Sequence, residues 1–243
     1  MLGLPDGIRA CLFDLDGVLT QTARVHRGAW RETFDALLRE CQDDDFKPFT
    51  DADYQEYVDG KPRRDGVRDF LASRGIRLPE GDPDDPPSVQ TVAGVGNRKN
   101  ELLLRRLEED GVEVYEGSVR YVRAAREQGL HTAVVTASAN GEAVVRAAGL
   151  ADCIEARIDG VVADQEHLRG KPAPDTFLAG ARALRVEPGE AAVFEDALAG
   201  VAAGRAGGFG FVVGVDRAGQ AEALRQRGAD IVVEDLSELL ERP

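Results

Sequence analysis

The feature that most constrains this chain is a short apolar run that ends in two closely spaced carboxylates. Residues 8–13 read "IRACLF" and are followed by Asp14, Asp16 and Gly17. A run of this length and composition predicts a buried strand. Ligands in open α/β sheets bind beyond the carboxyl ends of the strands, which is where Asp14 and Asp16 fall. The run therefore predicts a sheet with a functional carboxyl edge.

Three ordinary explanations of Asp14 and Asp16 compete with a functional one. A solvated turn is the first, because Asp side chains readily hydrogen-bond their own backbone in turns. A calcium loop that starts at Asp14 needs Gly at its sixth position and an acidic residue at its twelfth. This chain has Leu19 and Val25 there, which excludes such a loop. A helix N-cap explains one aspartate but not both.

Five short apolar runs predict parallel strands. They cover residues 8–13, 131–136, 191–194, 211–215 and 230–233. Helical patterns alternate with four of these runs. They cover residues 141–148, 175–185 and 219–227, and a stretch that Ser118 can cap and Gly129 can end. Strands that alternate with helices predict an α/β fold with a doubly wound parallel sheet.

Residues 21–110 break this alternation. They contain three helical stretches, "RGAWRETFDALLRE", "DGVRDFLASRG" and "NRKNELLLRRLEED", and no convincing strand. They also contain an acidic, proline-rich segment, "PEGDPDDPPSVQ", whose composition disfavours regular structure. We therefore expect a core formed by residues 1–20 and 111–243, with a helical insertion over residues 21–110.

Charge and cysteine content exclude several classes of function. The 44 acidic residues outnumber the 30 basic ones, for a net charge of −14. Such a field repels nucleic acid and anionic membrane surfaces, so neither is an expected partner. Cys11, Cys41 and Cys153 form neither a disulfide framework nor a zinc motif, which favours a reducing cytoplasm. We see no signal peptide and no apolar stretch of membrane-spanning length.

Further polar residues fall where other predicted strands end. Thr136 and Ser138 follow one strand, and Glu195 and Asp196 follow another. Lys171 lies in the loop before the helix predicted over 175–185. Each placement alone is a weak signal, but all of them deliver carboxylates, hydroxyls and one lysine toward the same edge of the sheet.

These residues carry a resemblance to a known superfamily. "DLDGVLT", then Thr136, then Lys171 in "GKPAPD", then "EDALAG" resemble the four ordered motifs of the haloacid dehalogenase-like (HAD) phosphotransferases. The resemblance spans nearly the whole chain and implies a Rossmann-like core. It also implies that residues 21–110 form a small α-helical cap domain that decides which substrate is accepted.

The resemblance implies a role for each motif residue. Asp14 is the expected nucleophile, which gives an aspartyl-phosphate, and Asp16 the expected general acid and base. Thr136 is expected to hydrogen-bond a phosphoryl oxygen, and Lys171 to add positive charge. Two anionic charges about 4 Å apart repel by roughly 1–4 kcal/mol, so a divalent cation is required. Mg²⁺ is the expected cofactor, and its expected ligands are Asp14, Asp16, Glu195 and Asp196.

The helical insertion resembles that of the β-phosphoglucomutase subfamily. Thr22, His26 and Trp30 recur at four-residue spacing, and His26 is expected to assist the general acid and base. In "DGKPRRDG", with Gly60, Arg63 is expected to hold the phosphate remote from the reaction, and Lys99 lies in a later Lys-Asn pair. The subfamily's second-motif loop corresponds to "TASANG", which supplies the remaining expected substrate contacts, Ala137, Ser138 and Asn140.

Two positions depart from that subfamily, and two rival functions stay open. Ala197 stands where many relatives have a hydroxyl, and Ala139 where mutases have Lys. The leading hypothesis is a monomeric, Mg²⁺-dependent sugar phosphomutase. It would interconvert β-glucose 1-phosphate and glucose 6-phosphate through glucose 1,6-bisphosphate. The rivals are a phosphatase of small sugar phosphates and a non-catalytic protein that binds phosphorylated ligands. The acid at position 16 disfavours a dehalogenase.

Overall fold

The computed structural model describes residues 2–41 and 46–241. The chain folds into two compact units. The first, here called the sheet unit, comprises Met1–Gln21 and Val112–Pro243, and the second, the helical unit, comprises Thr22–Gly111. Among the described residues, no helix is both long and apolar enough to cross a membrane.

The sheet unit contains a six-stranded parallel sheet in the order β3-β2-β1-β4-β5-β6. The strands are β1 (Ala10–Phe13), β2 (His131–Val135), β3 (Ala156–Ile158), β4 (Ala191–Glu195), β5 (Phe211–Val215) and β6 (Ile231–Val233). The central strand β1 pairs with β2 on one side and with β4 on the other. The predicted doubly wound α/β fold is confirmed.

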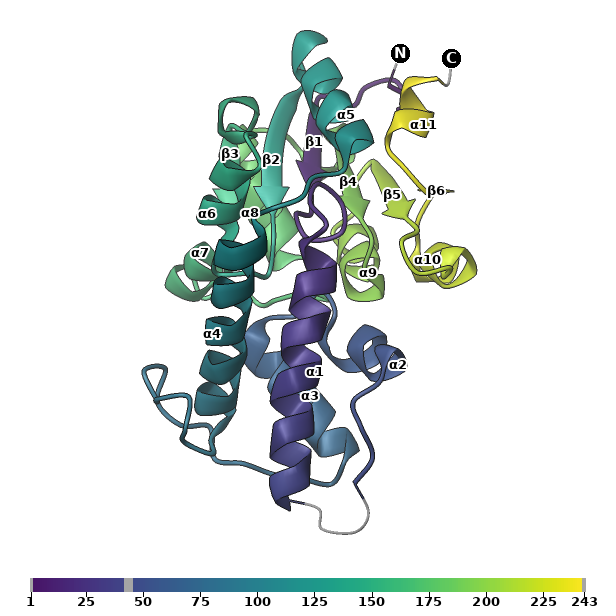
Figure 1. The fold of residues 1–243 in the computed structure, drawn as a ribbon. Coiled ribbons are helices and arrows are strands. Elements are labelled where there is room, and N and C mark those ends of the chain that lie inside the picture. Colours follow the sequence, from purple (N-terminus) through teal and green to yellow (C-terminus); the bar gives the residue numbers. More distant parts are fainter. Residues whose placement is uncertain (1, 42–45, 242–243) are drawn as a thin grey trace. The chain divides into compact units, whose positions relative to one another are not determined.

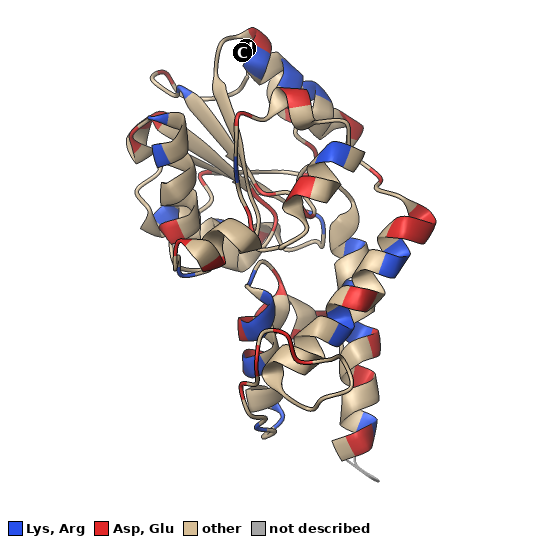
Figure 2. Cartoon of the chain, turned by 90° about the vertical axis from the view of Figure 1, so that its left-hand side faces the viewer, with Lys and Arg blue, Asp and Glu red and all other residues tan. Residues whose placement is uncertain are grey.

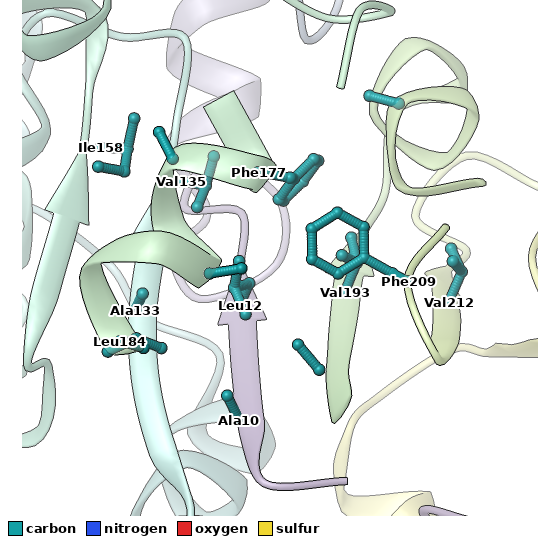
Figure 3. Close-up of a cluster of buried hydrophobic side chains, with 14 of the residues drawn as sticks. Ala10, Leu12, Ala133, Val135, Ile158, Phe177, Leu184, Val193, Phe209 and Val212 are labelled. Atoms are coloured by element: carbon teal, nitrogen blue, oxygen red, sulfur yellow. The ribbon is translucent and has the colours of Figure 1, made fainter. Parts of the chain in front are cut away.

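Both faces of the sheet are buried, as expected for parallel strands covered by helices. The helices of this unit are α5 (Glu116–Glu127), α6 (Gly141–Ala147), α7 (Gly160–Gln165), α8 (Asp175–Leu184), α9 (Leu198–Ala206), α10 (Ala221–Arg227) and α11 (Ser237–Leu240). Alternate strand residues such as Leu12, Val135 and Val193 join the cluster that Phe177 of α8 and Phe209 complete (Figure 3). This cluster fixes the strands whose carboxyl ends carry the motif residues.

The opposite face of the sheet packs against α5. Phe13 of β1 stacks on Phe194 of β4, with their ring centroids 4.5 Å apart. Tyr121 of α5 meets the edge of Phe13 and donates a hydrogen bond to the Leu2 carbonyl at 2.8 Å. In Figure 1, α5 lies across this face of the sheet. Strand β1 is therefore held from both sides just before the chain reaches Asp14.

The helical unit has its own apolar core. Its helices are α1 (Thr22–Cys41), α2 (Asp51–Asp53), a π-helical turn (Tyr54–Val58), α3 (Arg63–Ser73) and α4 (Val92–Asp110). Helices α1 and α4 lie side by side (Figure 1). Trp30 and Phe34 of α1 stack with centroids 4.9 Å apart, and Phe34 packs on Phe70 of α3 at 4.2 Å. Acidic and basic residues are interspersed along the long helices (Figure 2).

The chain passes between the two units through a pair of neighbouring segments, both of which belong to the sheet unit. Gln21 donates its backbone N–H to the Glu113 carbonyl at 2.8 Å, and Tyr115 donates to the Leu19 carbonyl at 3.0 Å. Thr20 and Val114 form an isolated antiparallel bridge between these segments. The entry and exit points of the helical unit are thus tied together.

The structure corrects one sequence prediction and adds several elements. Ser118 does not cap a helix: α5 starts two residues earlier, at Glu116, and Ser118 is buried inside its first turn. In the sheet unit, strand β3 and helices α7, α9 and α11 were not predicted. Strand β3 has only three residues, Ala156–Ile158, and Arg157 in its middle breaks the apolar pattern.

Candidate active site

The carboxyl edge of the sheet brings together the motif residues of four separate segments. Asp14 follows β1, and its backbone N–H donates to the Phe194 carbonyl of β4 at 2.9 Å. Thr136 follows β2, and its N–H donates to the Ile158 carbonyl of β3 at 2.9 Å. The sheet hydrogen bonds therefore continue one residue past the strands and set the direction in which each side chain leaves the edge.

Lys171 lies at the centre of this edge and is buried. Its Nζ donates to Asp14 Oδ1 at 2.5 Å, to Glu195 Oε1 at 2.6 Å and to the Val135 carbonyl at 3.1 Å. An ammonium has three donor hydrogens, so these three acceptors use all of them. Lys171 is therefore held rigidly between the ends of β1, β2 and β4.

Charge at this edge is unbalanced toward the negative. Burial alone lowers the pKa of Lys171, but the charges of Asp14 and Glu195 outweigh it and raise that pKa overall. Burial raises the pKa of Asp14 well above its usual range; Lys171 opposes this rise, while Glu195 and Asp16 add to it. One lysine does not compensate these carboxylates, so the edge favours an additional cation.

Asp16 is held differently from Asp14. It is half-buried, and its Oδ2 accepts a hydrogen bond from Thr136 Oγ1 at 3.2 Å. The loop that follows is ordered by its own hydroxyls, because Ser138 N–H donates to Thr136 Oγ1 and Asn140 N–H to Ser138 Oγ. Ala137 lies in the same loop, half-buried. The expected substrate-contact loop thus begins at the side chain that contacts Asp16.

Gly17 lets the chain turn closely beneath Asp196. Its φ is +98°, a conformation that side chains rarely adopt. A Cβ built at Gly17 would lie 1.9 Å from Asp196 Oδ2, so the carboxylate would have to move. The Asp196 carboxylate therefore lies directly against the turn that carries Asp14 and Asp16.

The donor set at this edge fits a hard divalent cation. Asp14 and Asp196 supply carboxylate oxygens, and both residues are buried. Within the described ranges, no three His, Cys, Asp or Glu side chains converge as a complete cage. Mg²⁺ suits such a site, because it binds through one or two carboxylates together with water and substrate phosphate. Glu195 differs from this expectation, since its oxygens accept from Lys171 and from the Ala197 N–H.

A second group of predicted residues gathers in the helical unit. Lys99 of α4 is buried, and its Nζ lies 3.0 Å from His26 Nδ1 of α1. The same Nζ lies 5.0 Å from the centre of the Trp30 ring. Thr22, the first residue of α1, is buried one turn before His26. His26 and Trp30, four residues apart on α1, therefore both lie next to Lys99, the lysine of the Lys-Asn pair on α4.

Arg63 belongs to a different contact in the helical unit. It starts α3, shortly after Gly60, whose φ is +70°. Arg63 Nη1 donates to Asn97 Oδ1 of α4 at 3.1 Å, and the Arg63 side chain is half-buried. The turn before α3 thus directs a guanidinium toward α4.

Comparison with known proteins decides the family. The model of the haloacid dehalogenase-like hydrolase family matches residues 8–208. The chain belongs to this family. This family's phosphotransfer chemistry makes the chain an enzyme, a phosphotransferase or phosphatase acting on sugar phosphates.

Individual relatives of this HAD-family chain are β-phosphoglucomutases. The Mycobacterium tuberculosis protein of that name is 55% identical over 247 residues, covering 99% of this chain and 94% of the relative. The solved structure of β-phosphoglucomutase from Clostridium difficile has a TM-score of 0.75 at 25% identity, covering 96% and 93% of the two chains. A CbbY variant from Rhodobacter sphaeroides, solved with xylulose-(1,5)bisphosphate, has a TM-score of 0.70 at 25% identity, covering 95% and 96%.

Two residues next to the HAD motifs were missed by sequence reasoning. Arg217 Nε donates to the Gly17 carbonyl at 2.9 Å, and its guanidinium lies 3.5 Å from the centre of the Tyr115 ring. Gln220 Nε2 donates to the Asp196 carbonyl at 3.1 Å. Both lie after β5, in "DRAGQ", at the same carboxyl edge as the motifs. The rule that polar residues after strands meet at this edge would have found them.

Proposed function

We propose that this enzyme is a Mg²⁺-dependent sugar phosphomutase that interconverts β-D-glucose 1-phosphate and glucose 6-phosphate. The observation that carries the proposal is the unequal environment of two neighbouring carboxylates. Asp14 is buried against Lys171, whereas Asp16 is half-buried against the Thr136 hydroxyl. Lys171 opposes the rise in the pKa of Asp14 and so favours its carboxylate form for attack, and Asp16 is kept accessible for proton exchange.

The proposed reaction uses these two groups in turn. A carboxylate oxygen of Asp14 attacks phosphorus, the bond from phosphorus to the sugar oxygen breaks, and Asp16 gives its proton to that oxygen. A sugar hydroxyl then attacks the aspartyl-phosphate, Asp16 takes the hydroxyl proton, and the Asp14 carboxylate leaves. Starting from the aspartyl-phosphate and β-glucose 1-phosphate, the C6 hydroxyl takes the phosphoryl group to give glucose 1,6-bisphosphate. The bisphosphate then binds in the reverse orientation, Asp14 takes its C1 phosphoryl group, and glucose 6-phosphate leaves.

We propose Asp14, the Asp16 carbonyl and Asp196 as the residues that hold Mg²⁺. When bound, Mg²⁺ supplies positive charge that offsets repulsion between the carboxylates and the phosphoryl group. Lys171 offsets the charge of Asp14, and Glu195 orients Lys171 through the 2.6 Å contact. Thr136 aligns Asp16 and can turn its hydroxyl toward a phosphoryl oxygen.

The helical unit supplies the proposed second half of substrate recognition. As an ammonium, Lys99 only donates, so His26 Nδ1 accepts and Nε2 carries the ring proton. His26 is then a fixed hydrogen-bond donor for the sugar. Arg63 is the proposed partner of the phosphate remote from the reaction. A mutase needs this second anion site, because its bisphosphate must bind in two orientations.

The 55% identity to a β-phosphoglucomutase over nearly the full length supports the mutase. A second candidate is a phosphatase of small sugar phosphates, in which water accepts the phosphoryl group. The CbbY variant that binds xylulose-(1,5)bisphosphate favours keeping this candidate, since a relative of the same fold holds a different sugar bisphosphate. A monomeric state and a cytoplasmic location stay predictions.

A ³¹P NMR time course tests the proposal. The protein is mixed with β-glucose 1-phosphate, Mg²⁺ and a trace of glucose 1,6-bisphosphate, and Asp14→Asn serves as the inactive control. We expect glucose 6-phosphate to accumulate with the natural sequence and neither product with Asp14→Asn. Inorganic phosphate as the sole product would contradict the mutase and favour the phosphatase.

A further inference from the structure

The acidic, proline-rich segment of residues 79–90 is held tightly on the N-terminal end of α4. Val92 N–H donates to the Pro79 carbonyl at 2.9 Å, and Ala93 N–H donates to the Glu80 carbonyl at 3.1 Å. The first N–H groups of a helix have no partner within the helix. Backbone carbonyls of the segment therefore complete the start of α4, although the segment itself has no regular structure.

Gly94 allows the backbone of the same segment to lie directly on α4. A Cβ at Gly94 would fall 2.2 Å from the Val89 carbonyl oxygen and 3.1 Å from that of Pro86. Any larger residue would push this backbone away from the helix. The 79–90 segment is therefore part of the packed surface of α4 rather than a loose loop.

Asn97 links this segment to Arg63. Its Nδ2 donates to the Pro83 and Asp85 carbonyls, both at 2.9 Å. Carbonyl oxygens only accept, so these two contacts place the NH₂ group of the amide on the segment side. The amide oxygen then points the other way, where it accepts from Arg63 Nη1 at 3.1 Å. The segment thus fixes the amide, and the amide fixes the guanidinium.

The stem of Arg63 is confined as well. A Cβ at Gly96 would lie 3.0 Å from Arg63 Cδ, so the side chain rests on α4 at a position without its own side chain. The Asn97 amide is neutral, so its hydrogen bond orients the guanidinium without neutralising the positive charge. An anion that binds a side chain already held in place costs less rotamer freedom.

We propose that Asn97 is a positioning residue that presets Arg63 for the phosphoryl group remote from Asp14 in a sugar bisphosphate. The proposal rests on the function proposed above and assigns the 79–90 segment as the support of that anion site. Selectivity for bisphosphates then depends on how the 79–90 segment holds Asn97.

The test compares Asn97→Ala with Arg98→Ala. Arg98 Nε also anchors the segment, at the Pro87 carbonyl, 2.9 Å away, whereas Asn97 is the residue of this pair that contacts Arg63. Each substitution is made in Asp14→Asn protein, and binding of glucose 1,6-bisphosphate is measured by isothermal titration calorimetry. We expect Asn97→Ala to weaken binding about tenfold, with Arg98→Ala changing it less than about threefold.

Catalytic measurements use the same substitutions in protein that retains Asp14. The KM for β-glucose 1-phosphate, whose phosphate occupies the remote site while Asp14 carries the transferred phosphoryl group, should rise more in Asn97→Ala than the KM for p-nitrophenyl phosphate, whose phosphate binds at Asp14. Gly96→Ala displaces Arg63 from the other side without removing an anchor of the segment, and it should show the same selective loss. This second variant keeps the test decisive if thermal melting shows that Asn97→Ala is poorly folded.

The outcomes separate the inference from the function on which it rests. If Arg63→Ala weakens bisphosphate binding while Asn97→Ala and Gly96→Ala do not, the positioning role of Asn97 is wrong and the anion site stands. If Arg63→Ala itself leaves bisphosphate binding unchanged, both the anion site and the inference are overturned. Equal losses in Asn97→Ala and Arg98→Ala would also contradict the inference, because they would report loosening of the segment alone.

Discussion

At the scale of single residues, Lys171 has two tasks that one substitution can separate. It forms buried ion pairs with Asp14 and Glu195. It therefore offsets the charge of two buried carboxylates and also places a positive charge at the reaction site. Removing one partner of a buried ion pair leaves an uncompensated charge, which costs about 3–5 kcal/mol. The stability of the fold and the chemistry of the site therefore depend on the same atom.

We predict that Lys171→Met lowers the free energy of unfolding by about 3–5 kcal/mol at neutral pH and abolishes phosphoryl transfer. Lys61→Met is the matched control, because Lys61 pairs with a largely exposed Asp69 at 2.6 Å. An exposed pair contributes about 1 kcal/mol or less. Urea unfolding monitored by circular dichroism measures both variants. Equal, small losses would show that Lys171 does not offset the buried carboxylates.

Gly17 offers a second prediction at this scale. Gly17→Ala combines a left-handed backbone conformation with a collision against Asp196, whereas Gly7→Ala has a similar φ, +91°, and open space around the new Cβ. We expect Gly7→Ala to cost about 1 kcal/mol of stability and to leave turnover unchanged. Gly17→Ala should also lower turnover at least tenfold, because Asp196 must move. The turnover of both variants is measured at matched protein concentrations. Similar turnover in Gly17→Ala and Gly7→Ala would contradict the close packing of Asp196 against Gly17.

At the scale of elements, the edge strand β3 depends on polar ties that flank it. Glu155, just before β3, accepts from His131 Nδ1 of β2 at 2.9 Å and pairs with Arg126 of α5. Partial burial raises the pKa of Glu155, but the hydrogen bond from His131 and the charge of Arg126 outweigh this and lower it below the ordinary value of 4.5. A carboxylate therefore joins three elements at this end of the sheet.

The pH dependence of Glu155→Gln follows from that lowered pKa. A group with a lower pKa in the folded state stabilises the protein fully above its unfolded pKa, and this contribution disappears as pH falls through the folded pKa. The natural sequence should exceed Glu155→Gln in stability by about 0.5–1 kcal/mol at pH 6, with the difference vanishing near pH 3. Chemical unfolding at both pH values measures it; a difference independent of pH would refute the charge interaction.

Elements differ in how far their sequence predicted them. Strand β1 was predictable because apolar residues on both of its faces precede Asp14, and the same holds for β5, whose predicted and observed bounds agree. Strand β3 was not, since three residues around Arg157 carry no periodic signal, and Arg157 is satisfied by Asp159 and Glu142 only after folding. Serine is a common N-cap residue, but α5 begins before Ser118, and the burial of Ser118 in the fold outweighs its preference for the cap position.

The candidate site shows the same division. Asp14 and Asp196 were predictable because their motifs follow predicted strands, and Lys171 because its loop precedes a predicted helix and matches a motif of the family. The contact of Asn97 with Arg63 was not, because it depends on where the 79–90 segment docks on α4, and composition indicates only that this segment lacks regular structure. Irregular segments lack the periodic apolar pattern that marks helices and strands, so the sequence does not indicate which contacts they make.

At the scale of the whole molecule, the chain has two separate apolar cores. One surrounds Leu12 and Phe177 in the sheet unit, and the other surrounds Phe34 and Phe70 in the helical unit. We propose that the first serves the phosphoryl-transfer site and the second serves substrate recognition. Two cores allow the second function to change without disturbing the first, because a packing defect in one need not propagate to the other.

Phe34→Ala tests this independence. Phe34 is fully buried and contacts Trp30, Phe49 and Phe70, so its truncation should cost the helical unit about 3–5 kcal/mol. Hydrogen exchange followed by mass spectrometry should show faster exchange in α1, α3 and α4, with β1, β2, β4 and β5 still protected. The control, Phe177→Ala in the sheet unit's core, should deprotect those strands. Faster exchange throughout the chain in Phe34→Ala would instead mean that the two cores unfold as one cooperative unit.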